Sequence, residues 1–208
     1  MKKFTSVVLI AALTTTLAAS LAACGSTQNQ SQQSSQAEAA QQTSVTQYPV
    51  TITTYDASGR EITQTFDKAP ERIVTNNLSA TETLIELGLG DKIVGMMNPD
   101  NTITSKYKDS IEKINKLGDK KSISKEVILS AAPDIVVGGE AMFSEKSLGA
   151  YTDWNNNGIN VYAQGASVTT GNVELTSVIQ DVKNLGIIFN VQDKANAYAD
   201  ELQKKYDA

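Results

Sequence analysis

From residue 72 onward, short apolar runs alternate with longer segments in which apolar residues recur every three or four positions. Short apolar runs are typical of buried strands, and the longer pattern is typical of amphipathic helices. The runs lie at residues 72–75, 92–97, 134–137 and 159–162, and the longer segments at 79–87, 107–114, 125–131, 144–155, 175–185 and 195–206. Because strands without polar alternation are buried on both faces, this order predicts an α/β fold with a parallel sheet flanked by helices.

A different pattern precedes this region. Apolar and polar residues alternate over residues 50–54, residues 56–59 (Asp-Ala-Ser-Gly) favour a turn, and Ile62 and Phe66 lie in a second extended run. Two alternating runs joined by a short turn are typical of a β-hairpin. We therefore expect the folded part to open with one.

Local signals set the expected ends of the first helices. Ser79 and Glu82 have the spacing of a capping box, so we expect Ser79 to be the N-cap and Glu82 to be structural. Gly88 favours a stop after the first helix, and Pro133 favours a stop after the segment at 125–131.

The segment at 195–206 shows no glycine or proline signal for a helix end before Ala208. A helix with an apolar stripe needs a partner surface. We therefore expect the chain to be a fragment of a longer protein or the product of an early-terminated reading frame.

The first 23 residues have the organisation of an export signal. Lys2 and Lys3 are followed by an uncharged, apolar or small stretch at residues 7–19, and small residues then lead to Cys24. The arrangement resembles a bacterial lipoprotein signal, which implies that Cys24 receives lipid and becomes the mature N-terminus. The alternative is an ordinary signal peptide with an unrelated cysteine. Lipidation predicts anchoring on the outer face of the cell membrane without a membrane span.

Residues 24–46 are expected to form a flexible tether. Positions 25–46 hold seven Gln, five Ser and three Thr, and Glu38 is their single charged residue. Such a segment has too little apolar surface to offset the entropy lost on ordering. The predicted domain borders are therefore residues 1–23 for the signal, 24–46 for the tether and 47–190 for the folded lobe.

Composition excludes several classes of function. The chain has 208 residues, 18 basic and 23 acidic side chains and a net charge of −5, so nucleic acid is not an expected partner. It has no histidine, which excludes histidine-based zinc sites and Ser-His-Asp catalysis. Cys24 is the single cysteine, so no intrachain disulfide forms. We expect no resident metal and no cofactor.

In a parallel sheet, ligands bind beyond the carboxyl ends of the strands. The loops there are Asn76-Asn77-Leu78, Asn98-Pro99-Asp100, Gly138-Gly139-Glu140 and Gln164-Gly165-Ala166. The candidate ligand-binding residues are Asn76, Asn77, Met97, Asn98, Gly139, Glu140 and Gln164. We expect most of the nearby Met96, Met97, Met142 and Phe143 to belong to the core, and Tyr151 and Trp154 to pack on the sheet.

Taken in order, four passages resemble the N-terminal lobe of the iron-chelate/cobalamin class (class III) of substrate-binding lipoproteins, which serve ABC importers. They are Val50 to Ile62; Pro70-Glu71-Arg72-Ile73-Val74 with Thr81-Glu82-Thr83-Leu84 and Leu87-Gly88; Ser124-Lys125-Glu126-Val127-Ile128 with Ala132-Pro133-Asp134-Ile135-Val136; and Gly158-Ile159-Asn160-Val161-Tyr162. The resemblance covers nearly all of the chain after the tether.

The resemblance implies two lobes joined by one long helix, of which residues 191–208 would be the truncated start. It also implies a monomer whose Glu126 pairs with arginines of the ABC permease. The alternative for Glu126 is a first-turn acid that stabilises the helix dipole.

The resemblance implies a solute-binding protein and not an enzyme, with an iron(III)-siderophore as the expected ligand. Haem or cobalamin in the same system is the alternative ligand. An exported α/β hydrolase, a surface adhesin and a non-functional truncated product are the alternative functions. Against the hydrolase, the chain has no Gly-x-Ser-x-Gly motif and no phosphate-binding loop.

Overall fold

The computed structural model describes residues 45–168 and 174–208; the predicted signal peptide, Cys24 and the tether up to residue 44 lie outside the described residues. The strands are β1 Val50–Tyr55, β2 Glu61–Phe66, β3 Ile73–Thr75, β4 Ile93–Met97, β5 Lys116–Gly118, β6 Ile135–Gly138 and β7 Asn160–Ala163. The α-helices are α1 Leu78–Glu86, α2 Lys108–Lys113, α3 Lys125–Ser130, α4 Tyr151–Asn155, α5 Leu175–Ile188 and α6 Gln192–Tyr206. Short 3₁₀ helices cover Gly90–Lys92, Ser105–Tyr107, Glu140–Phe143 and Gly165–Ser167. No helix of the described part is long and apolar enough to cross a membrane.

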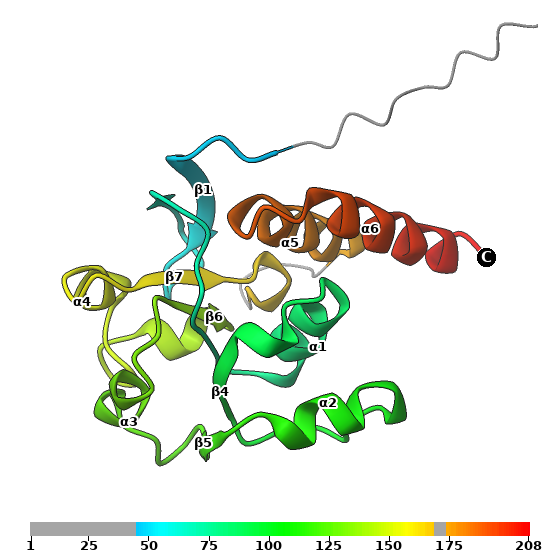
Figure 1. The fold of residues 1–208 in the computed structure, drawn as a ribbon. Coiled ribbons are helices and arrows are strands. Elements are labelled where there is room, and N and C mark those ends of the chain that lie inside the picture. Colours follow the sequence, from blue (N-terminus) through cyan, green and yellow to red (C-terminus); the bar gives the residue numbers. More distant parts are fainter. Residues whose placement is uncertain (1–44, 169–173) are drawn as a thin grey trace, which may run out of the picture. The chain divides into compact units, whose positions relative to one another are not determined.

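The parallel sheet is confirmed, with strand order β5-β4-β3-β6-β7 and every pair parallel (Figure 1). β5 was not predicted, because it has only three residues and none is fully buried. Placing β3 and β6 side by side in the middle brings the loops that follow them together at one edge. This is the edge where parallel sheets bind ligands.

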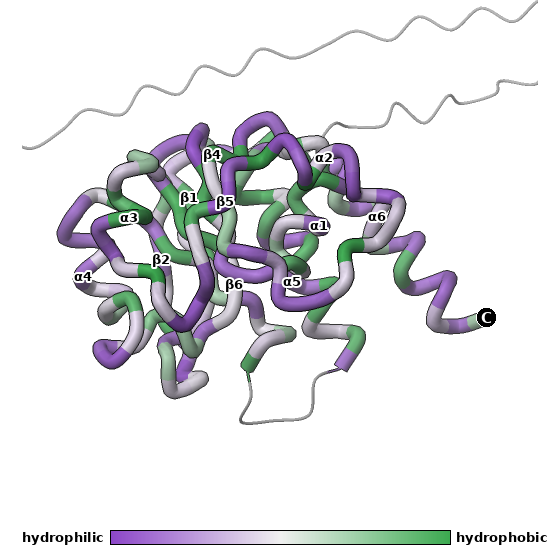
Figure 2. Tube along the Cα trace, turned by 90° about the horizontal axis from the view of Figure 1, so that it is seen from below, coloured by the Kyte–Doolittle hydropathy of each residue, from purple (hydrophilic) through white to green (hydrophobic). Residues whose placement is uncertain are grey.

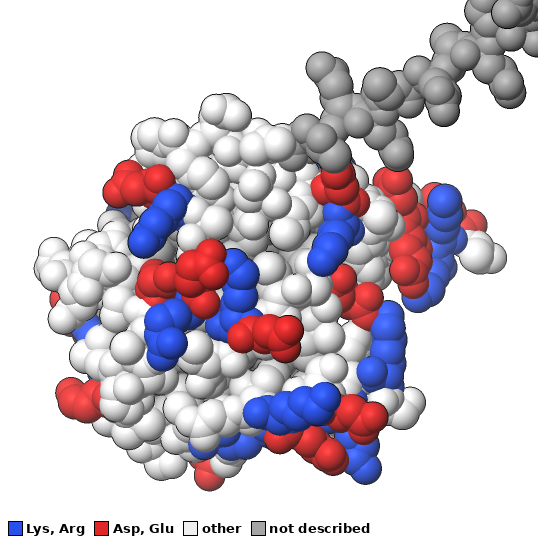
Figure 3. Space-filling view, in the orientation of Figure 1, with Lys and Arg blue, Asp and Glu red and all other residues white. Residues whose placement is uncertain are grey.

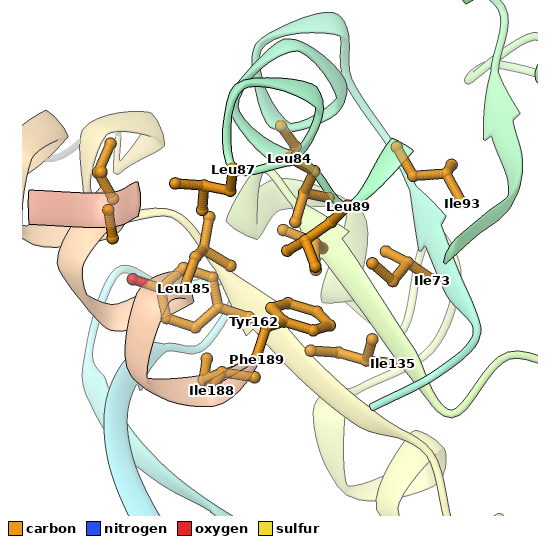
Figure 4. Packing of buried hydrophobic residues seen from close by; sticks show 14 of the residues in the cluster. Ile73, Leu84, Leu87, Leu89, Ile93, Ile135, Tyr162, Leu185, Ile188 and Phe189 are labelled. Atoms are coloured by element: carbon orange, nitrogen blue, oxygen red, sulfur yellow. The ribbon is translucent and has the colours of Figure 1, made fainter. Parts of the chain in front are cut away.

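Alternate residues of the central strands separate two hydrophobic cores. Ile73 and Ile135 contact the core beneath α1, α2, α5 and α6 (Figure 4), whereas Val74 and Val136 contact the core beneath α3 and α4. All four side chains are 0% exposed. The hydropathy view agrees, since the apolar residues gather along the central strands and the polar residues lie on the outer helices (Figure 2). A sheet covered on both faces explains why its strands read as continuous apolar runs.

The hairpin of β1 and β2 is confirmed and packs beside β7. Its buried polar side chains complete the hydrogen bonding of the outer strand. Thr54 Oγ1 donates to the Ala163 carbonyl at 2.9 Å and accepts from the Ala163 N–H at 2.8 Å. Gln64 Oε1 accepts from the Val161 N–H at 3.3 Å. The hairpin thereby protects a sheet edge that would otherwise expose backbone groups.

The chain before β1 is tied to the corner between α5 and α6. Thr46 Oγ1 donates to the Ile187 carbonyl at 2.7 Å, and its backbone N–H donates to Asn190 Oδ1 at 2.8 Å. Tyr48 adds a hydrogen bond from its hydroxyl to the Ile188 carbonyl at 2.7 Å. Thr46, the last residue of the predicted tether, is thus held in the fold where α6 begins.

Two local predictions were wrong. The N-cap of α1 is Asn77, whose Oδ1 accepts from the Ala80 N–H at 2.7 Å, so Ser79 lies inside the helix. Glu82 accordingly forms no capping box, and its carboxylate accepts a hydrogen bond from Thr104 Oγ1 at 2.8 Å. The helix expected over residues 144–155 is reduced to α4, because Gly149 has a φ of +90° that an α-helix cannot contain.

Gly186 lies where α5 contacts α6, and we expect this contact to be sensitive to an added side chain. A Cβ at this buried position would lie 2.4 Å from Ala195 Cβ, so Gly186→Ala must push the two helices apart. We expect a loss of about 1–3 kcal/mol in the free energy of unfolding, although alanine favours helices. Chemical denaturation measures it. Gly90→Ala is the control, because its Cβ would meet Ile85 at an ordinary 3.6 Å. A Gly186→Ala variant as stable as the parent would contradict this packing.

Candidate functional site

A groove of about 390 Å³ lies at the carboxyl edge of the sheet, within the size range of small-molecule sites. It is lined by the loops after β3, β4, β5, β6 and β7. The lining residues are Asn76, Asn77, Ser79, Asp100, Asn101, Lys120, Gly139, Glu140, Ala141, Met142 and Ser167. Most of them carry an amide, a hydroxyl or a charge, but the surface that they expose to the groove is mainly apolar, so the groove offers apolar contacts together with a few polar groups.

The floor of the groove is held by Asn76, the first residue after β3. Its Oδ1 accepts from the Gly139 N–H at 2.8 Å and its Nδ2 donates to the Gly139 carbonyl at 3.2 Å. Asn76 is 0% exposed, and Gly138 leaves space for its side chain, because a Cβ there would lie 1.9 Å from Asn76 Oδ1. The amide therefore joins the loops of the two central strands and gives the groove a fixed base.

Asn77 connects α1 to the loop after β7. Besides capping α1, its side chain donates from Nδ2 to Gln164 Oε1 at 3.3 Å. Gln164 is 5% exposed. Both amides are thus already held by the protein, and Asn77 is the one that lines the groove.

A buried acid on α5 fixes the loop that carries Gln164. Asp181 accepts from the backbone N–H groups of Gly165 and Ala166 at 2.8 and 2.9 Å, and from the Tyr162 hydroxyl at 2.8 Å. Burial raises the pKa of the Asp181 carboxyl, and the three hydrogen bonds oppose that rise. Burial also raises the pKa of Tyr162, which therefore stays a hydrogen-bond donor.

Two groups of charged residues face the groove. Glu140 is 4% exposed and accepts from Ser167 Oγ at 2.9 Å. Lys120 Nζ lies 2.5 Å from Asp100 Oδ2, and both side chains are about one-third exposed. Burial alone would raise the pKa of Asp100, but the hydrogen bond and positive charge of Lys120 leave it below its ordinary value. The ion pair is therefore formed at neutral pH.

The structure brings most of the predicted ligand residues together. Asn76, Asn77, Gly139 and Glu140 line the groove, and Gln164 adjoins it through Asn77. Met97 and Asn98, like Gln164, do not line it. Asn98 donates from Nδ2 to Asp119 Oδ1 at 2.7 Å, and Met97 is 1% exposed in the core under α3 and α4.

The expectation that the neighbouring sulfur and aromatic side chains belong to the core is confirmed for four residues. Met96, Met97, Phe143 and Trp154 are at most 1% exposed. Tyr151 and Met142 are partly buried against the same core, and Met142 also lines the groove.

Sequence reasoning missed several lining residues. Lys120 follows β5, a strand that was not predicted, and Asp100 was seen in the loop after β4 but not chosen. Ser167 lies in a 3₁₀ helix whose position depends on Asp181. Only the Asn98-Pro99-Asp100 loop carried a visible signal, namely a polar turn after a buried strand.

A second hollow, of about 600 Å³, lies between β1 and the first half of α5. Its walls include Thr51, Thr53, Tyr55, Thr176 and Gln180. It contains none of the predicted ligand residues. Its larger volume is outweighed by the position of the smaller groove at the carboxyl edge of a parallel sheet.

Glu126 is exposed in the first turn of α3, away from the groove lining. A hydrogen bond from Ser124 is the main cause that lowers the pKa of its carboxyl. The side chain therefore carries its charge throughout the neutral range. No group of three or more Cys, His, Asp or Glu that could hold a metal occurs in residues 45–168 and 174–208.

Asn76→Asp tests the base of the groove. The substitution places a carboxylate oxygen opposite the Gly139 carbonyl, where the amide donated. We expect a loss of about 2–3 kcal/mol in unfolding free energy near pH 7. Burial and the facing carbonyl raise the folded-state pKa of the new carboxyl above its unfolded value of about 4, so the loss shrinks as the pH falls toward 4.

Urea denaturation at several pH values measures this effect. Asn196→Asp, at an exposed position of α6, is the matched control and should change stability little at any of these pH values. A loss that is the same at pH 4 and pH 7 would contradict the assigned contact.

The sequence of the chain is similar to proteins of one known family. The family model for periplasmic binding proteins matches residues 73–208. An uncharacterized ABC transporter substrate-binding lipoprotein of Bacillus subtilis (strain 168), YvrC, is 36% identical over 124 residues, which cover 60% of this chain and 34% of that protein.

Two solved structures are also similar. A periplasmic binding protein from Veillonella parvula DSM 2008 superposes with a TM-score of 0.70 at 30% identity, covering 77% of this chain and 51% of that one. A structure described as an ABC-type Fe³⁺-hydroxamate transport system from Saccharomonospora viridis DSM 43017 superposes with a TM-score of 0.60 at 26% identity, covering 76% of this chain and 54% of that one. The chain thus spans about half the length of these solved proteins. With a family match over more than half of its residues, the chain belongs to the periplasmic binding protein family, a family of binding proteins and not of enzymes.

Proposed function

We propose that this chain captures a ferric siderophore in the groove at the carboxyl edge of its sheet and delivers it to an ABC import permease. The observation that carries the proposal is the groove itself, built from the loops of five parallel strands around Asn76 and Gly139. Its amides and hydroxyls suit the oxygen-rich surface of a metal chelate, which needs hydrogen bonds and no direct metal ligand. The chain has no histidine to hold a bare transition metal.

The lining disfavours haem. A haem group needs an axial ligand such as His, Tyr, Cys or Met. Of the lining residues in the described part of the chain, none is aromatic, and Met142 is the single candidate for an axial ligand. The similarity to a structure described as a ferric hydroxamate transport system also supports the siderophore proposal.

We infer that Glu126 contacts the permease. It is a charged, exposed residue beside Val127, which is 39% exposed, so the two offer a carboxylate next to a small apolar surface. A carboxylate at such a site pairs well with arginine. The exposed position, outside the groove, leaves it accessible while a ligand is bound.

We further propose that Cys24 carries the lipid anchor on the extracytoplasmic face. The support is the order of a basic start, an apolar stretch, small residues and the cysteine, together with the similarity to a substrate-binding lipoprotein. A lipid on Cys24 would hold the folded part at the membrane through a polar segment.

Isothermal titration calorimetry with a neutral ferric trishydroxamate tests the ligand site. We expect saturable 1:1 binding that Ala141→Trp weakens about tenfold or more, because the indole occupies the groove. Ala197→Trp, on the exposed side of α6, is the matched control and should retain the parent affinity. If haemin or cobalamin binds saturably and the ferric trishydroxamate does not, the siderophore proposal is wrong. If none of the three binds, the proposed site is refuted.

Glu126→Gln tests the permease contact. We expect the affinity for the ferric chelate to stay unchanged and uptake by cells that depend on this protein to fall about three- to tenfold, since charge pairing governs encounter and orientation. Glu145→Gln removes another exposed carboxylate and serves as the control. Equal uptake by the Glu126 variant and the parent protein would remove the assignment.

A further inference from the structure

Three charged side chains line the groove. Lys120 is the one cation among the lining residues of the described part of the chain, and Asp100 and Glu140 are the two carboxylates. A ligand that enters the groove meets these three groups at close range. Their balance therefore decides which ligand charge is tolerated.

Lys120 is already paired with a carboxylate. Its Nζ donates to Asp100 Oδ2 at 2.5 Å, in a pair whose side chains are 30% and 34% exposed. An anionic ligand would have to compete with a carboxylate that is already in hydrogen-bonding contact and fixed in place. The residues beside Lys120 do not change this, because Asp119 and Lys121 carry opposite charges and lie outside the lining.

Glu140 is the second carboxylate of the lining. Its side chain is nearly enclosed, and it accepts a hydrogen bond from Ser167 Oγ. By side-chain type, the described lining therefore holds two carboxylates and one ammonium group.

The other polar side chains that line the groove are uncharged, so they do not distinguish ligands by charge. The Asn101 amide and the hydroxyls of Ser79 and Ser167 can both donate and accept hydrogen bonds, whereas the Asn76 amide is held by Gly139. On the face shown in Figure 3, acidic and basic side chains are interleaved, so this face has no extended area of one sign. Selection by charge is therefore expected to arise inside the groove.

We propose that the groove selects ferric chelates of zero or positive net charge over anionic ones, and that Asp100 sets this selectivity by occupying Lys120. The proposal rests on the proposed binding function and specifies the class of chelate. Asp100 acts in two ways: it repels an anion directly, and it withholds from the anion the one cation of the lining.

Calorimetric titration of the chain with three ferric chelates tests the selection. The probes are a monocationic trishydroxamate, a neutral trishydroxamate and a trianionic triscatecholate. We expect the first two to bind with similar affinity and the trianion at least about tenfold more weakly, with the difference shrinking at high salt. A trianion that binds as tightly as the neutral chelate, or more tightly, overturns the proposal.

Asp100→Asn then tests the role of Asp100 in this selectivity. The amide keeps the shape but frees Lys120, so the affinity for the trianion should rise about five- to tenfold while that for the neutral chelate changes less than twofold. Lys120→Met is the second variant, and it should weaken the trianion further and strengthen the monocation. Asp109→Asn removes an exposed carboxylate on α2, outside the groove, and should leave all three affinities unchanged.

The outcomes separate the two proposals. An Asp100→Asn variant with the parent ratio of affinities overturns the role of Asp100, even if the chelates bind. Failure of all three ferric chelates to bind the parent chain refutes the proposed function itself, and the charge selection with it.

Discussion

The paired hydrogen bonds between the Asn76 side chain and the Gly139 backbone hold the two central loops together beyond the point where β3 and β6 stop pairing. An amide side chain can donate and accept at once, as the N–H and carbonyl of a single residue require. Gly138 completes the contact by leaving room for the amide. Because the amide is fully buried, its donor and acceptor would both be costly to leave without partners, so the geometry of the loops is fixed.

The sequence predicted the sheet well because each central strand is covered on both faces. Ile73 and Val74 point to different cores, yet both are buried, so the run reads as continuously apolar. β5 escaped prediction because it is a short edge strand with no fully buried residue. The helix expected across Gly149 failed for a local reason, a backbone conformation that the apolar pattern does not encode.

The position of the groove was easier to predict than the residues that line it. The rule that ligands bind at the carboxyl ends of parallel strands pointed to Asn76, Asn77, Gly139 and Glu140, which do line the groove. The same rule placed Met97 in the site, but a residue at the end of a strand faces either the loop or a core, and Met97 faces a core. Contacts between distant segments, such as the one between Asp100 and Lys120, follow from tertiary packing and leave no trace in local spacing.

The residues that shape the groove and those that face its opening have different surroundings. Asn76 and Asp181 are buried and fully occupied by protein partners, so changing them costs stability before it changes binding. Asp100 and Lys120 are about one-third exposed, and water can replace the contacts that they lose. Charge preference can therefore be altered at the opening of the groove while its base stays intact. Under the proposed function, the same rigid sheet edge would accept chelates of different charge through a few exposed substitutions.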